Sequence, residues 1–155
     1  MVNLISFKLK TAKVTSAEVK LLSNELHKEL ELIYGGGIIE EFIEENEQML
    51  VFYVAYDVNE NAVACGALKH FDVSTAEIKR MYVKPEYRGR GLSKLILTEL
   101  ENKAKELNYN KIVIETGLKQ PEAMSLYFKF GYKPLICYGR HANDPDSRCF
   151  EKIIY

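Results

Sequence analysis

The sequence has few of the features that mark disulfide frameworks, metal sites or membrane proteins. Its three cysteines, Cys65, Cys137 and Cys149, are odd in number and lack C-x-x-C spacing. Neither a disulfide framework nor a zinc site is indicated, so we expect buried or incidental thiols and no bound metal. No apolar run approaches the roughly 20 residues that a membrane span needs, and the N-terminal residues lack the basic-then-apolar order of a signal peptide. We therefore expect a cytoplasmic protein without a membrane partner.

The chain also lacks an excess of charge of one sign. Its 21 basic and 22 acidic residues give a formal net charge of −1, so no global field attracts it to nucleic acid or to an anionic membrane. Any anion site must therefore be local. Repeats, linkers and low-complexity segments are absent, and 155 residues of which 47% are hydrophobic can bury a substantial core. We expect one domain over residues 1–155.

Hydrophobic periodicity predicts a mixture of strands and amphipathic helices. Helices are expected from the capping box at Thr15–Glu18 to Gly35, over the acidic stretch 38–46, from Gly91 to Leu107, and from Pro121 to Gly131. A hairpin is expected around the turn Asn59-Glu60-Asn61. The predicted strands cover residues 5–10, 50–58, 62–71, 76–83, 111–116, 132–138 and 149–155.

The most informative segment is Val83 to Lys94, VKPEYRGRGLSK, which joins an apolar strand to a helix. Gly89 and Gly91 allow positive φ and a close approach of the backbone to a ligand. The helix that begins near Gly91 offers unpaired N–H groups and the positive end of its dipole. Arg88 and Arg90 add charge with a geometry suited to phosphate oxygens. The segment therefore predicts an anion site.

Standard nucleotide motifs do not fit this turn, because Lys94 stands where a dinucleotide fingerprint needs its third glycine. The run from Arg88 to Ser93, R-G-R-G-L-S, instead resembles the R/Q-x-x-G-x-G/A motif of the GCN5-related N-acetyltransferases (GNAT). In that family the loop amides bind the pyrophosphate of acetyl-CoA. Ser93 departs from the usual Gly or Ala but is also small.

Neighbouring segments extend this resemblance over about residues 50–133. Residues 76–83 resemble the family's fourth strand and residues 111–116 its fifth, while Gln120 to Tyr127 resembles its N-x-x-A-x-x-L-Y segment. The resemblance implies an α/β (α+β) fold with a mixed, mostly antiparallel sheet of six or seven strands and about four helices. It also implies a splayed cofactor cleft between the fourth and fifth strands.

The resemblance further implies which residues bind acetyl-CoA as co-substrate. Backbone groups of Met81, Tyr82 and Val83 would pair with the pantetheine arm as an added strand would. Gln120 replaces the family's usual Asn, so a carboxamide contact of different reach is expected. The pyrophosphate would lie on the turn formed by Arg88, Gly89, Arg90, Gly91, Leu92 and Ser93.

Two residues are candidates for acid–base catalysis. Glu77 matches the catalytic glutamate of the histone-acetylating branch, and its structural alternative is a strand carboxylate paired with Lys69 or Lys79. Tyr127 matches the tyrosine whose hydroxyl reaches the CoA sulfur, and its alternative is a core aromatic. Two-residue alternation places Glu77 and Met81 on one face of their strand.

Acceptor contacts are expected from three further places in the chain. Tyr34 and the adjacent triple glycine would wall the acceptor pocket, because the family places substrate contacts in the first helix-to-helix loop. Arg80, Arg140 and Arg148 would clamp a carboxylate, with residues 138–144 as a lid; a solvated surface loop is the alternative. His70 and His141 are candidate bases, although a lone histidine is more often hydrogen-bonded or exposed.

Three functions remain open at this point. The first is acetyl-CoA-dependent N-acetylation of a primary amine of a small molecule, such as an amino acid or amine metabolite. The second is acetylation of protein lysines or N-termini in a shallow peptide groove. The third is a non-catalytic acyl-CoA sensor, against which the presence of both Glu77 and Tyr127 argues. A homodimer through the C-terminal strands is common in the family and is an expectation here.

Overall fold

A computed structural model describes residues 6–35 and 49–155 of the chain. The acidic helix predicted over residues 38–46 lies outside the described residues, as do Gly36 and Gly37. The described helices are α1 (Ala17–Tyr34), α3 (Leu92–Glu106) and α4 (Pro121–Lys129), with single 3₁₀ turns at Pro85–Tyr87 and Gly139–His141. Within the described ranges, no helix is long and apolar enough to cross a membrane.

Seven strands form one mixed sheet, which confirms the predicted fold class. They are β1 (Lys8–Ala12), β2 (Met49–Tyr56), β3 (Ala62–His70), β4 (Thr75–Val83), β5 (Lys111–Gly117), β6 (Lys133–Leu135) and β7 (Ser147–Ile153). Their spatial order is β1-β2-β3-β4-β5-β7-β6. The pair β4–β5 is parallel and the other neighbours are antiparallel.

Boundaries differ from the sequence prediction mainly at the ends of the chain. The first strand begins at Lys8, three residues later than predicted, and β6 is only three residues long. The first helix takes Ser16 as its N-cap, one residue after the Thr15 of the predicted box, and the Ser16 hydroxyl accepts a hydrogen bond from the Val19 N–H at 3.4 Å. Both serine and threonine can cap, so sequence alone does not fix the starting residue.

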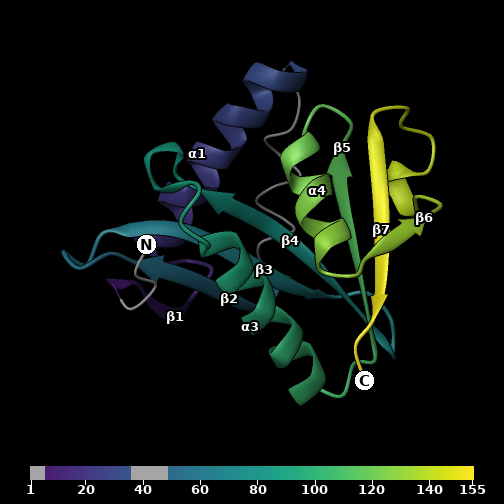
Figure 1. The fold of residues 1–155 in the computed structure, drawn as a ribbon, viewed down its shortest axis with the longest axis horizontal. Coiled ribbons are helices and arrows are strands. Elements are labelled where there is room, and N and C mark those ends of the chain that lie inside the picture. Colours follow the sequence, from purple (N-terminus) through teal and green to yellow (C-terminus); the bar gives the residue numbers. More distant parts are fainter. Residues whose placement is uncertain (1–5, 36–48) are drawn as a thin grey trace.

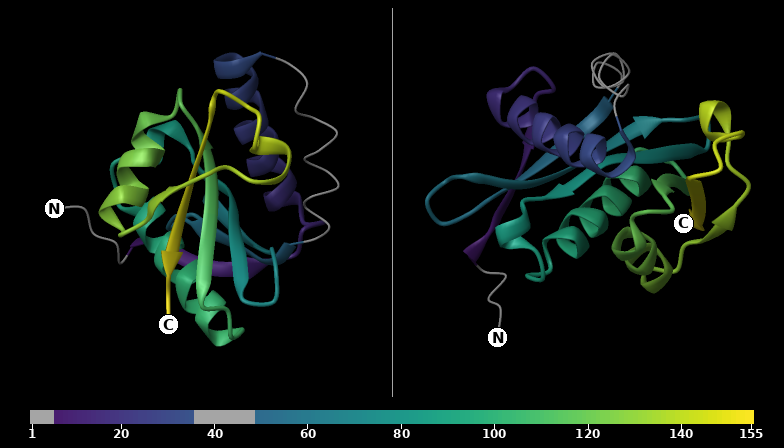
Figure 2. Two further views of the ribbon diagram at one scale, coloured as in Figure 1. Left: turned by 90° about the vertical axis from the view of Figure 1, so that its right-hand side faces the viewer. Right: turned by 90° about the horizontal axis from the view of Figure 1, so that it is seen from above.

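Helices cover both faces of the sheet (Figure 2). On one face, Val19, Leu22 and Leu26 of α1 pack against Phe52 and Val54 of the hairpin. On the other face, α3 and α4 pack over the centre of the sheet. That larger core is built from the apolar stripe of α3, Tyr127 of α4 and inward residues of the central strands, among them Leu92, Ile96, Leu97, Leu100, Leu68, Ile78, Ile112 and Ile114.

The central feature of the sheet is the short pairing between β4 and β5. Their register covers only Thr75–Ile78 against Lys111–Ile114, although both strands continue beyond it. From there the two ribbons diverge, and α4 lies over the opening on the α3 side (Figure 1). The two strands thus form a V. Inside it, the backbone groups on their facing edges are no longer part of the β4–β5 ladder.

A bulge in β4 changes which side chains face the V. Arg80 has a left-handed φ of 60°, and the pairing with β3 shifts register between Cys65 and Ala67. Ile78 and Val83, five residues apart, consequently both lie in the α3-side core. Strict alternation would place them on opposite faces. The prediction that Glu77 and Met81 share a face is therefore wrong, because the bulge inserts a residue between them.

Gly66 lies on β3 opposite this bulge and allows α3 to pack close to the sheet. A Cβ built at Gly66 would lie 2.6 Å from Ile96 Cγ2, 2.7 Å from Met81 Sδ and 3.0 Å from Leu100 Cδ1. These contacts set the distance between α3 and the sheet, and the first turn of α3 forms the predicted anion site.

We expect Gly66→Ala to lower the free energy of unfolding by about 1–3 kcal/mol, because an added methyl group overpacks this contact. Chemical denaturation would measure the change. The exposed α3 variant Asn102→Ala is the control and should stay within about 0.5 kcal/mol of the parent. A Gly66→Ala protein as stable as the parent would contradict the close packing of α3 on β3.

Candidate active site

The anion turn has the backbone geometry that its glycines predict. Gly89 and Gly91 adopt φ values of 77° and 81°, and nothing lies within 4 Å of a Cβ built at Gly89. Gly91 is the N-cap of α3, and no side chain caps the helix there. The first-turn N–H groups of α3 are thus left for a ligand, and the helix dipole favours a negative one.

The two arginines of the turn hold it in place through different partners. The Arg88 Nε donates to the Val83 carbonyl at 2.9 Å, and its guanidinium lies 2.7 Å from the Glu29 carboxylate of α1. The guanidinium of Arg90 lies over the Tyr87 ring, 5.1 Å from its centroid. Arg88 therefore ties the turn to α1, in addition to the phosphate role predicted for it.

The V between the strands leads from this turn into the sheet. Tyr82 and Val83 pair with Cys65 and Ala64 of β3 on one side. Their opposite backbone edge faces β5, whose own ladder with β4 ended at Ile114. The predicted pantetheine contacts of Met81, Tyr82 and Val83 thus lie on an edge that can accept an extended ligand as an added strand.

Tyr127 of α4 is buried behind the V, with 4% of its surface exposed. Its ring packs against Tyr132 and Phe150 at centroid distances of 5.9 and 6.1 Å. Burial, and after it the Glu115 carboxylate, raises the pKa of the Tyr127 phenol. The hydroxyl therefore keeps its proton at neutral pH, so the core packing and the predicted acid role are compatible.

Gln120 lies at the N-cap of α4 and closes the turn that leaves β5. Its side-chain oxygen accepts hydrogen bonds from the Thr116 hydroxyl at 2.7 Å and from the Gly117 N–H at 3.3 Å. The carboxamide oxygen is thus used inside the protein. The proposed contact of Gln120 with the cofactor would have to come from its amide nitrogen.

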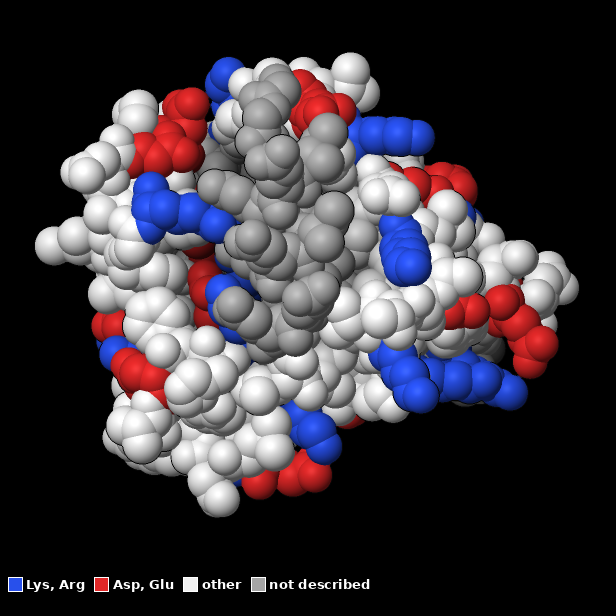
Figure 3. All heavy atoms as spheres, turned by 180° about the vertical axis from the view of Figure 1, so that it is seen from behind, with Lys and Arg blue, Asp and Glu red and all other residues white. Residues whose placement is uncertain are grey.

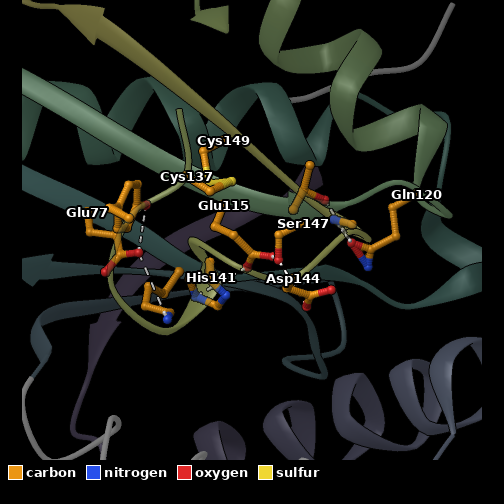
Figure 4. Close-up of polar contacts among 12 residues, drawn as sticks. Glu77, Glu115, Gln120, Cys137, His141, Asp144, Ser147 and Cys149 are labelled. Atoms are coloured by element: carbon orange, nitrogen blue, oxygen red, sulfur yellow. Dashed lines mark hydrogen bonds and ion pairs between the residues drawn. A yellow bond between two sulfur atoms is a disulfide. The ribbon is translucent and has the colours of Figure 1, made fainter. Parts of the chain in front are cut away.

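Glu77 is buried, with 5% of its surface exposed, on the α1 side of β4. Its carboxylate accepts a hydrogen bond from the Tyr138 hydroxyl at 2.9 Å and lies 4.0 Å from Lys79 Nζ (Figure 4). The pairing with Lys79 is the structural alternative considered for this residue. Glu77 therefore has two partners of its own inside the site.

A second carboxylate, Glu115, lies beside Glu77, and the sequence analysis missed it. Glu115 follows Ile114, the last β5 residue paired to β4, and accepts a hydrogen bond from the Ser147 hydroxyl at 3.0 Å. His141 Nε2 lies 3.8 Å from its other oxygen. The pKa of Glu115 is raised to about 7, mainly by burial. The Glu77 and Asp144 carboxylates contribute to this rise, and the Ser147 hydroxyl and Lys79 oppose it.

The loop from Cys137 to Cys149 brings three of these partners to the carboxylates. Tyr138 reaches Glu77, while His141 and Ser147 reach Glu115 (Figure 4). Asp144 adds a hydrogen bond from Ser147 at 3.2 Å. This segment thus contributes side chains to both carboxylates, and its role as a lid stays a prediction.

A disulfide joins Cys137 to Cys149, with their Cα atoms 5.1 Å apart, and closes this loop. The prediction that the cysteines are incidental thiols is wrong for this pair. Antiparallel pairing of β6 with β7 places Leu135 opposite Cys149 and so brings Cys137 near it. Cys65 is free and buried, as predicted, and burial raises its pKa to about 12.

Tyr34 closes the end of the V at the last residue of α1. Its hydroxyl accepts a hydrogen bond from the Lys119 N–H at 3.1 Å and occupies the place where a Gly117 Cβ would be. Burial raises the pKa of the Tyr34 phenol, and the Glu115 carboxylate contributes to the same rise. Tyr34 thus lies near Glu115, and its place at an acceptor pocket stays a prediction.

The arginines predicted to clamp a carboxylate come from three separate segments of the chain. Arg80 is buried in the β4 bulge, and its carbonyl accepts a bond from the Cys65 thiol. Arg140 is exposed in the 3₁₀ turn at Gly139–His141. Arg148 donates to the carbonyls of Pro145 and Ser147 in its own loop. His70 Nδ1 and the Tyr109 hydroxyl lie within hydrogen-bond distance, at 2.7 Å.

A cavity of about 320 Å³ lies beside the site, between α4, β6 and β7. Its apolar wall includes Phe128, Leu135 and Phe150, with the disulfide along one edge. The anion turn and the exposed edge of β4 do not border it. Asp144, Ser147 and Arg148 also line this cavity, so it adjoins the carboxylate end of the site.

The sequence is similar to those of known proteins. The sequence matches the acetyltransferase (GNAT) family over residues 17–132. The chain belongs to this family. It is 32% identical over 91 residues to an IAA acetyltransferase of Azospirillum brasilense, and 30% identical over 100 residues to the N-acetyltransferase YsnE of Bacillus subtilis. These alignments cover 58% and 63% of this chain, and 60% and 66% of the relatives.

Solved GNAT structures share the whole fold. A Klebsiella pneumoniae protein superposes with a TM-score of 0.83 at 26% identity, covering 96% of this chain and 98% of the other. A GNAT acetyltransferase from Elizabethkingia anophelis with acetyl-CoA bound gives 0.75 at 21% identity, again over 96% and 98% of the two chains. The family resemblance and the predicted fold are thus confirmed.

The surface carries no dominant sign of charge on the face seen from behind. Acidic and basic side chains alternate across it (Figure 3), as the net charge of −1 would suggest. The two carboxylates of the site, by contrast, have specific partners: Glu77 accepts from the Tyr138 phenol, and Glu115 lies beside the His141 imidazole.

We expect the disulfide that closes the site loop to stabilise the protein by about 3 kcal/mol, because a cross-link across a loop of this length lowers the conformational entropy of the unfolded chain. A thiol reductant should lower the Tm of the parent. It should leave the Tm of the Cys137→Ser/Cys149→Ser double variant unchanged, since that protein has no bond to lose. Equal sensitivity of both proteins to the reductant would contradict this role.

Glu115 should make stability depend on pH. Its folded pKa of about 7 lies above its ordinary value of 4.5, so its favourable contribution is present below about pH 4.5 and is lost as pH rises through 7. The unfolding free energy of Glu115→Gln minus that of the parent should therefore be about 2 kcal/mol larger at pH 8 than at pH 5. Denaturation curves at both pH values would measure it, and a constant difference would contradict the raised pKa.

Proposed function

We propose that this protein is an acetyl-CoA-dependent N-acetyltransferase that acetylates a primary amine of a small molecule by direct attack on the thioester. The observation that carries the proposal is the end of β4–β5 pairing at Ile78 and Ile114. The resulting V has an open anion turn at one end and buried carboxylates at the other. A ligand with a phosphate, an extended amide arm and a reactive thioester matches the order of these groups along the V.

Each part of the V has a role in binding acetyl-CoA. The first-turn N–H groups of α3, beside Gly89 and Gly91, would hold the pyrophosphate. The free edge of Met81–Val83 would pair with the amides of the pantetheine arm. Bound acetyl-CoA supplies an electrophilic thioester carbonyl and a thiolate leaving group. The buried Tyr127 hydroxyl, which keeps its proton at neutral pH, would then protonate the leaving sulfur.

The acceptor end favours a small amine over a protein segment. Tyr34 lies across Gly117, and the Leu118 N–H donates to the Asp146 carbonyl, which joins the end of β5 to the site loop. Tyr138 lies over Glu77 from the same loop. These contacts place side chains and loop backbone across the acceptor end, which supports a small amine over a peptide that would need an open groove. Acetylation of protein lysines or N-termini is therefore the second candidate.

The test is CoA release from acetyl-CoA with a panel of amino acids, polyamines, aminoglycosides and lysine peptides. Tyr127→Phe should lower kcat about 100-fold for the accepted amine, because the leaving thiolate loses its proton donor. Its affinity for acetyl-CoA should match that of the parent. Tyr132→Phe is the matched control, since its hydroxyl bonds to Glu101 on the far side of the core, and it should keep its kcat.

The outcome separates the three functions. Selective release with a small amine supports the proposal, and selective release with the lysine peptides supports the second candidate. Tight binding of CoA without transfer to any amine, together with no effect of Tyr127→Phe, would support an acyl-CoA sensor and contradict an enzymatic role.

A further inference from the structure

The two carboxylates of the site are not equivalent in position. Glu77 lies on the second-to-last paired rung of β4, opposite Val113, where the V is closed. Glu115 is the first β5 residue beyond the pairing, at the point where the V opens. A substrate that enters the V therefore meets Glu115 before it can reach Glu77.

Glu77 is also the more buried of the two. The Tyr138 hydroxyl donates to Glu77 Oε2 at 2.9 Å, and Lys79 Nζ lies 4.0 Å from the same oxygen. The Glu77 side chain is 7% exposed and that of Glu115 is 22% exposed. A hydroxyl and an ammonium group around a carboxylate stabilise its charge and occupy its lone pairs. Glu77 is thus suited to hold neighbouring groups in place.

Glu115 is surrounded by groups that would let it accept and release a proton. On the β7 side, the Ser147 hydroxyl donates to it and Asp144 lies next to that serine. On the β4 side it faces Glu77 and Lys79. The site loop adds His141, whose Nε2 lies 3.8 Å from Glu115 Oε2, and Tyr138. The His141 side chain is 17% exposed, so the imidazole is partly accessible to solvent.

The Glu115 carboxylate also lies within electrostatic reach of two tyrosines across the V. Tyr127 on α4 and Tyr34 on α1 both have a pKa raised by burial and, to a smaller extent, by the Glu115 charge. Glu115 therefore lies close enough to the proposed acid for its charge to act on the Tyr127 hydroxyl.

Resting on the function proposed above, we propose that Glu115, rather than Glu77, takes the proton from the attacking amine, and that His141 passes this proton to solvent. Glu77 is a positioning residue that holds Tyr138 and Lys79. The site loop then contributes directly to proton transfer, because His141 and Ser147 both contact Glu115.

The protons and electron pairs balance as follows. Glu115 carboxylate removes one proton from the ammonium group, which leaves a neutral amine. The nitrogen lone pair forms the N–C bond to the acetyl carbonyl, and the C–S bond breaks with its electron pair on sulfur. Tyr127 gives its proton to sulfur and regains one from the new amide nitrogen through water. His141 carries the first proton to solvent, so one proton is released per acetyl group transferred.

The pH dependence of kcat/KM tests this assignment in the parent, Glu115→Gln and Glu77→Gln, with the best amine from the acceptor panel. The parent should show a break near pH 7. In Glu115→Gln we expect that break to disappear and kcat/KM at pH 7 to fall by about 100-fold or more. Glu77→Gln should keep the break, with a rise in KM because Tyr138 and Lys79 lose their partner. Glu151→Gln, on β7 beside Lys111, is the matched control and should behave as the parent.

Two further measurements separate a loss of catalysis from a loss of folding, and they do not depend on which amine is the acceptor. All variants should bind acetyl-CoA as the parent does and should unfold cooperatively. In protein labelled with ¹³C at the glutamate carboxyls, one resonance should titrate near pH 7 and be missing from Glu115→Gln. Its absence from the parent spectrum would overturn the proposal.

The kinetic outcomes are also decisive. A Glu115→Gln protein that keeps both its rate and its break near pH 7 would overturn the inference alone, as would loss of that break in Glu77→Gln. A parent that binds acetyl-CoA and transfers acetyl to no amine would overturn the proposed function, and the inference with it.

Discussion

The structure of the site depends on the early end of pairing between two parallel strands. β4 and β5 form four rungs and then separate, although each continues for several residues. Unpaired backbone groups inside a protein are costly unless something satisfies them. Beyond their last paired residues, the facing edges of β4 and β5 can therefore offer backbone groups to a ligand or to solvent. The anion turn, α4 and the site loop all border this opening.

The bulge at Arg80 and the glycine at position 66 set the position of α3 relative to the V. The bulge turns Met81 and Val83 toward α3, and Gly66 lets that helix lie close enough for its first turn to face the V. At the other end, the disulfide holds the loop whose side chains contact the two carboxylates. Binding of the cofactor and chemistry at the acceptor are thus supported by different contacts, so substitutions at one end need not disturb the other.

Features that depend on neighbours in sequence were predictable. The capping residues before α1 and the positive φ of Gly89 and Gly91 follow from local preferences. Features that depend on register between distant strands were not. The bulge at Arg80 becomes visible only when β3 and β4 are paired. The disulfide needs β6 and β7 side by side, although two cysteines on either side of a loop between two predicted closing strands were a usable signal.

Glu115 was overlooked for a related reason. It lies in the run Ile112-Val113-Ile114-Glu115-Thr116, where an acidic residue inside an apolar strand was itself a signal of an unusual environment. The family resemblance directed attention to Glu77 instead. Only the end of the β4–β5 pairing shows that Glu115 faces an opening.

The most direct test of the account is hydrogen exchange of backbone amides with and without CoA. If CoA binds in the V, amides of residues 81–83 and of the turn from Arg88 to Lys94 should exchange more slowly when it is present. The amides of Phe128 and Leu135, which line the 320 Å³ cavity, should exchange at unchanged rates. Protection confined to the cavity, with the turn unaffected, would contradict the assignment of the V as the cofactor site.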